Sequence, residues 1–142
     1  MSQRAANSGI ELIDRDECLT LLAGDEIGRL AIIDAGRPLI FPVNYGLDGE
    51  DIVVRTAPGT KLEQGPRSPA CFEIDGFDRP SRAGWSVVVT GRLDEVTPYH
   101  GHAFTRADSL ELHPWAEGAK DHLLRLAPSS ITGRRIRARV DG

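Results

Sequence analysis

The sequence has little of what cross-linked, metal-stabilised or membrane-spanning proteins are built from. Its 142 residues include two cysteines, Cys18 and Cys71, each among apolar neighbours that are typical of buried thiols. This content provides no disulfide framework and no zinc ligand set. No apolar run is long enough to cross a bilayer, and the first residues lack the apolar core of a secretory signal. We therefore expect a cytoplasmic protein with no membrane partner.

Positive charge is not concentrated enough to indicate nucleic-acid binding. The net charge is −4, which gives no basic footprint over the whole chain. The basic run 134–139 alternates with apolar residues and has no stacking aromatics nearby, so it predicts a strand with one solvated basic face. We expect no nucleic-acid partner. The length fits one domain over residues 10–142, after a disordered N-terminal tail over residues 1–9.

What is present is a series of short apolar segments separated by turn residues, the pattern of antiparallel strands. The predicted strands are 28–34, 38–45, 51–56, 70–75, 85–97 and 131–140. A capping-box pattern at Asp14 and Glu17 predicts a helix over 15–23. Residues 76–83 are expected to form a polar loop, 99–110 are compatible with a helix, and 122–127 fit helix or strand. The early connections are too short for crossover helices, so we predict a mainly β fold with flanking helices, a small β-barrel.

A possible anion site follows the third predicted strand. Arg55 and Lys61 supply positive charge, Thr56 and Thr60 supply hydroxyl groups, and Gly59 allows a ligand to approach the backbone. A capping box at Thr60 opens a short helix, whose first N–H groups suit a phosphate monoester. The spacing is not that of a Walker A loop. A capped surface helix with two solvated cations explains the same residues.

Pro42 lies within a predicted strand, where it removes one donor of the hydrogen-bond ladder. It therefore belongs on an edge, or beside something other than a strand. The backbone groups of Val43, Asn44 and Tyr45 along that edge could bind a planar ring with donors and acceptors on its rim. An ordinary edge strand is the alternative.

Other polar residues give weaker signals. The four histidines are spaced to bring at most two together, which predicts no metal site. Glu73 and Asp75 share a strand face and Asp78 follows, and we expect a Glu paired with an arginine and a strand-end Asp in a turn. No nucleophile–base arrangement is recognisable, so we assign no catalytic residue.

In order and spacing, several of these segments resemble the pyridoxamine 5′-phosphate oxidase-like, FMN-binding split-barrel family. The segments are Gly28–Ala31, Pro42–Tyr45, Arg55–Leu62, Phe72–Asp75, Gly84–Val87 and Val89–Arg92. The resemblance implies a split β-barrel and a homodimer with two FMN sites at the subunit interface.

The resemblance also implies which residues meet the cofactor. The phosphate would be held by the hydroxyls and lysine of the third-strand turn, and the ring would lie along the main chain of the second strand. The start of the long strand would reach the flavin, and the partner subunit would add an aromatic and a basic residue, the latter Arg134 or Arg135. The implied cofactor-binding residues are Pro42, Val43, Asn44, Tyr45, Arg55, Thr56, Thr60, Lys61, Trp85, Ser86, Trp115 and Arg134.

Two functions follow from this resemblance. The first is an FMN-dependent oxidoreductase with a small-molecule electron donor and an acceptor that the sequence does not identify. The substrate residues of the longer pyridoxamine phosphate oxidases cannot be placed, which disfavours that activity. The second is a non-catalytic carrier or sensor that binds flavin, a deazaflavin cofactor or haem.

Overall fold

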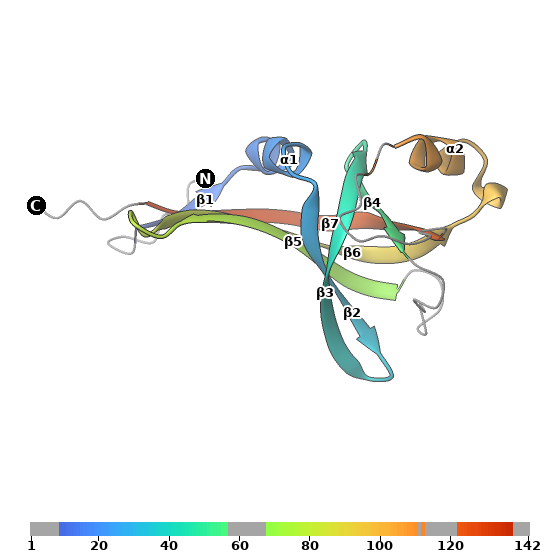
Figure 1. Ribbon diagram of the computed structural model, residues 1–142, viewed down its shortest axis with the longest axis horizontal. Coiled ribbons are helices and arrows are strands. Elements are labelled where there is room, and N and C mark those ends of the chain that lie inside the picture. Colours follow the sequence, from blue (N-terminus) through green and yellow to red (C-terminus); the bar gives the residue numbers. More distant parts are fainter. Residues whose placement is uncertain (1–8, 57–67, 111, 113–121, 138–142) are drawn as a thin grey trace, which may run out of the picture.

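The computed structural model describes residues 9–56, 68–110, 112 and 122–137. Strands dominate these residues, with two α-helices and one 3₁₀ turn (Figure 1). The elements are β1 (Ile10–Ile13), α1 (Arg15–Ala23), β2 (Ile27–Asp34), β3 (Arg37–Asp48), β4 (Asp51–Thr56), β5 (Ser68–Asp78), β6 (Ala83–Val96), η1 (Pro98–His100), α2 (His102–Ser109) and β7 (His122–Ile136). No helix in this described part is long and apolar enough to cross a membrane.

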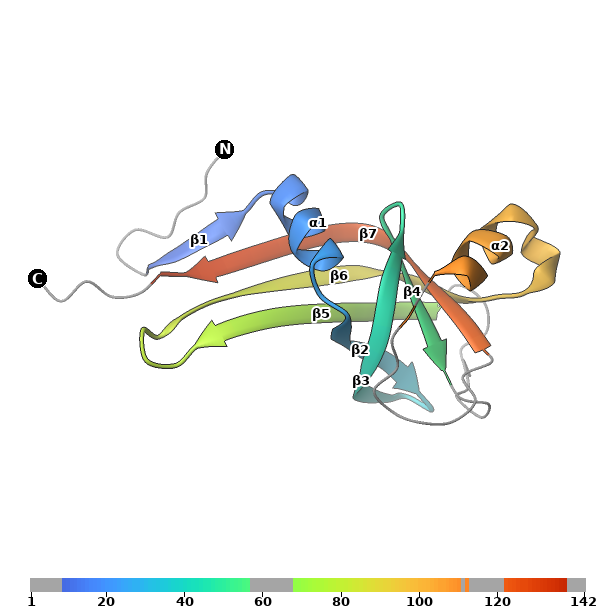
Figure 2. The same cartoon turned by 45° about the horizontal axis from the view of Figure 1, so that its top comes forward.

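The strands form one antiparallel sheet that closes on itself. The order is β1-β7-β4-β3-β2-β5-β6, and β6 also pairs with β7, so six strands form a ring and β1 extends the end of β7. The long strands β5, β6 and β7 continue past the ring as a ribbon beneath α1, while α2 lies toward the other end (Figures 1 and 2). The predicted mainly β barrel with flanking helices is confirmed.

Alternation along the strands builds the core. Inward residues such as Phe72, Ile74, Val87 and Val89 are fully buried, and the outward residues between them are not. The Phe72 ring occupies the space over Gly28, where a Cβ atom would lie 2.1 Å from its Cζ. Glycine at this position therefore lets β2 pack closely on the neighbouring strand.

Most predicted elements are confirmed, and the main errors concern strand length. The helix over 15–23 has the predicted bounds, with Glu17 N–H donating to the Asp14 carboxylate at 2.8 Å. The predicted loop 76–83 is wrong, because β5 and β6 extend to residues 78 and 83. The segment 122–127 is a strand continuous with β7, and a helix lies within 99–110. β1 was not predicted.

The basic face predicted for the last strand is only partly solvated. The Arg137 guanidinium contacts the Glu11 carboxylate at 2.6 Å, and Arg135 forms an ion pair with Glu17 of α1. These pairs tie β7 to the N-terminal segment, a role that local alternation does not reveal. The helix predicted at Thr60 and residues 1–8 of the tail predicted over 1–9 lie outside the described residues.

Candidate functional site

The barrel wall opens between β3 and β4. Among the described strands, β3 pairs with β4 over Tyr45–Asp48, whereas its residues Arg37–Asn44 pair with β2 alone. Beyond Val54, β7 is the one described strand that pairs with β4. The two strands therefore separate where Asn44 faces Arg55, and one edge of the 37–43 segment has no strand partner in the described structure. We call this opening the β3–β4 split; it confirms that Pro42 lies on a strand edge.

Some side chains of the Pro42–Tyr45 segment lie at the split and others face the core. Pro42 is exposed, and the partly exposed Asn44 amide donates to the Glu26 carbonyl at 3.4 Å. Val43 packs against the core, and Tyr45 is 3% exposed. The Tyr45 hydroxyl donates to the Leu22 carbonyl, and burial raises the pKa of this phenol above its ordinary value. The Tyr45 N–H donates to the Glu26 carbonyl at 3.1 Å, so alternation along β3 points the main-chain groups of Val43 and Tyr45 toward β2 and those of Pro42 toward the open edge.

Arg55 lies at the other margin of the split. Its Nη2 atom donates to the Asp108 carbonyl oxygen at 2.8 Å and to the Asp108 Oδ1 atom at 3.0 Å. About a quarter of the side chain remains exposed. For Thr56 the structure describes the backbone, as the last residue of β4. Thr60, Lys61 and Trp115 lie outside the described residues, so their predicted roles remain predictions.

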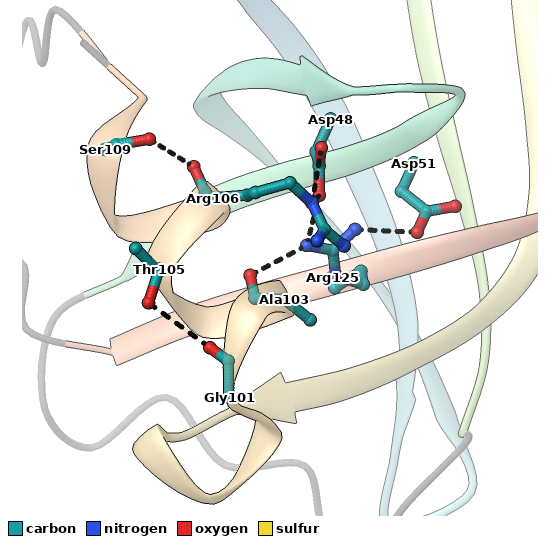
Figure 3. A network of polar contacts seen from close by, with 8 residues as sticks. All are labelled: Asp48, Asp51, Gly101, Ala103, Thr105, Arg106, Ser109 and Arg125. Atoms are coloured by element: carbon teal, nitrogen blue, oxygen red, sulfur yellow. Dashed lines mark hydrogen bonds and ion pairs between the residues drawn. The ribbon is translucent and has the colours of Figure 1, made fainter.

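A network of charges fixes α2, and therefore Asp108, on the barrel (Figure 3). The Arg125 guanidinium donates to Asp48 and Asp51, both at 2.7 Å, and to the Ala103 carbonyl at 3.2 Å. Arg106 of α2 donates from Nε to Asp48 at 3.1 Å. Burial opposes ionisation of Asp48, but hydrogen bonds from the two arginines outweigh it and hold the pKa of its carboxyl below the ordinary value.

Apolar contacts also hold α2 against the barrel. Ala107 is fully buried with Val53, Val96 and Leu123 in a small cluster on the outside of the barrel. Sequence reasoning missed this helix-to-barrel contact and the link from Asp108 to Arg55. The two residues are 53 positions apart, and no local pattern connects them.

The remaining candidates lie near the far end of the long ribbon. Ser86 pairs with Arg134, and Trp85 with Arg135. Trp85 covers Gly76, where a Cβ atom would lie 2.8 Å from its Nε1 atom, and it lines an open groove of about 690 Å³. Arg135 is bound to Glu17, whereas Arg134 is exposed and makes no ion pair with any residue that the structure describes. Arg134 is therefore the better placed of the two predicted arginines.

The two groups of candidates are far apart on one chain. Arg55 pairs with Leu123, and Leu123 pairs with Val96 of β6. Ser86 precedes Val96 by ten residues on the same strand, which corresponds to about 30 Å at the usual rise per residue. This is farther than a flavin mononucleotide reaches. A single chain therefore does not bring Arg55 and Ser86 to the same cofactor.

The carboxylates of β5 have a partner on β2. Arg29 donates from Nε to Glu73 at 2.9 Å, as expected for a paired glutamate, and its Nη2 atom contacts Asp75 at 2.8 Å. Asp75 lies within β5, and the strand-end aspartate of the turn is Asp78, whose carboxylate accepts from the Ser81 N–H at 3.2 Å. Burial, reinforced by a hydrogen bond with Asp75, raises the pKa of Glu73 above its ordinary value. The described residues contain no cluster of three His, Cys, Asp or Glu that could hold a metal ion.

Comparison with known proteins agrees with this geometry. An uncharacterised protein of Mycobacterium tuberculosis is 37% identical, over 95% of this chain and 90% of its own. The structure of an FAD-binding protein from Mycobacterium smegmatis is 33% identical, with a TM-score of 0.73 over 89% of this chain and 97% of its own. An FAD-binding protein from Mesorhizobium loti is 25% identical, with a TM-score of 0.70 over the same shares. The family model described as pyridoxamine 5′-phosphate oxidase matches residues 14–135, so this split barrel belongs to the pyridoxamine 5′-phosphate oxidase family.

Proposed function

We propose that the protein binds FMN in the β3–β4 split and serves as a flavin-dependent oxidoreductase. The observation that carries this proposal is the edge of residues 37–43, which has no strand partner in the described part of the chain, beside the Arg55 guanidinium. A flavin ring has hydrogen-bond donors and acceptors along its rim, which such an edge can satisfy. The arginine supplies charge for the phosphate. The FAD-binding relatives support a flavin nucleotide, since FMN and FAD share the ribityl phosphate.

The chain's own residues would bind and orient the cofactor. Arg55 would meet the phosphate together with Thr56, Thr60 and Lys61 of the predicted turn. The main-chain groups that the Pro42–Tyr45 segment presents at the open edge would hold the ring and keep water from one side of it. A bound flavin would supply electron transfer between a small-molecule donor and an acceptor. No described residue stands out as a catalytic acid or base.

We further propose that two chains form each site as a homodimer. The 30 Å separation of Arg55 from Ser86, about ten residues of strand, supports this, because a second copy can bring its ribbon end to the split of the first. Trp85, Ser86, Arg134 and the predicted Trp115 would then be the partner's contribution. Both regions expose apolar side chains that a monomer leaves uncovered, with Ile40 68% and Phe77 67% exposed.

The visible spectrum of the purified protein tests the cofactor. We expect the bands of oxidised flavin, and mass spectrometry of the released cofactor should distinguish FMN from FAD and deazaflavin. Added FMN should stabilise cofactor-free protein by about 2.7 kcal/mol at a hundredfold excess over Kd. A colourless protein that gains no thermal stability from FMN or FAD would overturn the proposal, and a haem spectrum would favour the carrier alternative.

Sedimentation of the cofactor-loaded protein tests the shared site. The expected mass is that of two chains. Arg134→Ala should weaken FMN binding, because Arg134 would reach the cofactor of the other copy, whereas Arg79→Ala in the β5–β6 turn should not. A protein that sediments as a monomer with FMN bound would contradict the shared site. It would not contradict the proposal that the protein binds a flavin.

A further inference from the structure

Asp108, near the C-terminal end of α2, is the residue that holds Arg55 at the split. One guanidinium nitrogen, Nη2, donates both to the carbonyl oxygen and to the carboxylate of Asp108. The contact joins a strand residue to a helix residue that local sequence does not relate to it. The position of the Arg55 guanidinium therefore depends on where α2 lies.

The helix that carries Asp108 is itself fixed to the barrel at several points. Arg106 is bound to Asp48, and the Ala103 carbonyl accepts from Arg125 (Figure 3). Ala107 is fully buried in a cluster with Val53. Val53 and Arg55 lie two residues apart on β4, so they share the strand face that α2 covers. Asp108 is thus held at a defined place over Arg55.

The contact with Asp108 uses one of the three nitrogen atoms of the Arg55 guanidinium. Nε and Nη1 of Arg55 make no hydrogen bond with any residue of the described part of the chain. An arginine fork can give two parallel hydrogen bonds to a phosphate, and the gain is larger when its long side chain is already ordered. The Asp108 carboxylate is 55% exposed, so solvent screens its repulsion of a nearby phosphate.

We propose that Asp108 is a positioning residue. It orders the Arg55 guanidinium so that the free donors meet the phosphate of the flavin nucleotide, and it thereby sets the preference for FMN over riboflavin. This inference rests on the proposed flavin-binding function. It adds a residue from α2 to the margin of the β3–β4 split at Arg55.

Two substitutions at this position separate ordering from charge. Asp108→Ala removes the carboxylate acceptor, whereas Asp108→Asn keeps an oxygen acceptor and removes the charge. Flavin fluorescence titration of both variants with FMN and with riboflavin is the measurement. We expect Asp108→Ala to weaken FMN binding about fivefold, Asp108→Asn to bind FMN at least as tightly as the parent, and riboflavin affinity to stay unchanged.

Matched controls fix the interpretation. Asp16→Ala removes one exposed carboxylate from α1 and should change neither affinity. In an Arg55→Ala background, Asp108→Ala should have no further effect on FMN.

Three results would overturn the inference. The first is that Asp108→Ala tightens FMN binding as much as Asp108→Asn does. The second is that the two variants weaken FMN binding equally. The third is that Asp108→Ala weakens riboflavin binding as much as it weakens FMN binding. If the parent protein binds neither flavin, the proposed function fails as well; if it binds FMN and the variants do not separate, only the role of Asp108 fails.

Discussion

Replacing Lys61 by alanine is expected to weaken FMN binding by about 10- to 100-fold, the value of one or two hydrogen bonds to a charged group. Riboflavin affinity should not change, because riboflavin lacks the phosphate that the lysine would bind. Lys61 has the larger expected effect of the turn residues, since an ammonium both neutralises charge and donates hydrogen bonds. Parallel fluorescence titrations with the two flavins measure the difference.

The control for this experiment is Arg15→Ala. Arg15 is a half-exposed cation of α1 that pairs with Glu50, so its loss changes the net charge by the same amount without touching the split. It should leave both affinities unchanged. Equal weakening of FMN and riboflavin by Lys61→Ala would show that the turn supports the fold and does not bind phosphate.

Replacing Arg125 by alanine should lower the free energy of unfolding by about 3–5 kcal/mol, the usual cost of removing one partner from a buried ion pair. The Arg125 side chain is 14% exposed and is bound to the carboxylates of Asp48 and Asp51. The substitution removes this cation from both. Urea denaturation measures the change. Arg106→Ala, at a residue whose side chain is 56% exposed, should cost only about 0–1 kcal/mol. Similar costs for the two variants would show that Arg125 is not the centre of the network.

The same network predicts an acid-dependent loss of stability. The pKa of Asp48 is lower in the folded protein than in the unfolded chain. Its stabilising contribution is therefore complete above the unfolded carboxyl pKa, about 3.9, and is lost as the pH falls through the lower folded value. Arg125→Ala should flatten this part of the pH profile. An unchanged profile would contradict the assignment.

Local sequence predicted elements well where one residue decides the boundary. Asp14 caps α1, and Gly36, with φ 76°, follows Ala35 in the two-residue turn from β2 to β3. The pairings that open the barrel depend on partners far along the chain. Long-range contacts decide whether β4 pairs with β3 or with β7 after Val54, and no local sequence pattern contains these contacts.

The candidate site was predictable to a similar depth. Pro42 correctly indicated a strand edge, and alternation could have separated Asn44 from Val43 and Tyr45, which face the core. The link from Asp108 to Arg55 required the position of α2, because a helix that packs on the outside of a barrel is placed by tertiary contacts. Arg134 was distinguished from Arg135 only by the ion pair with Glu17.

The edge of residues 37–43, without a strand partner among the described residues, also bears on how the protein avoids aggregation. An open strand edge can recruit a strand from another chain. Pro38 and Pro42 are four residues apart in this strand, so both remove an N–H donor from the same edge. The N–H face of a strand proline normally points away from its paired neighbour. The two prolines thus make the opening a poor template for a further strand, while its carbonyl groups remain able to accept hydrogen bonds from a small molecule.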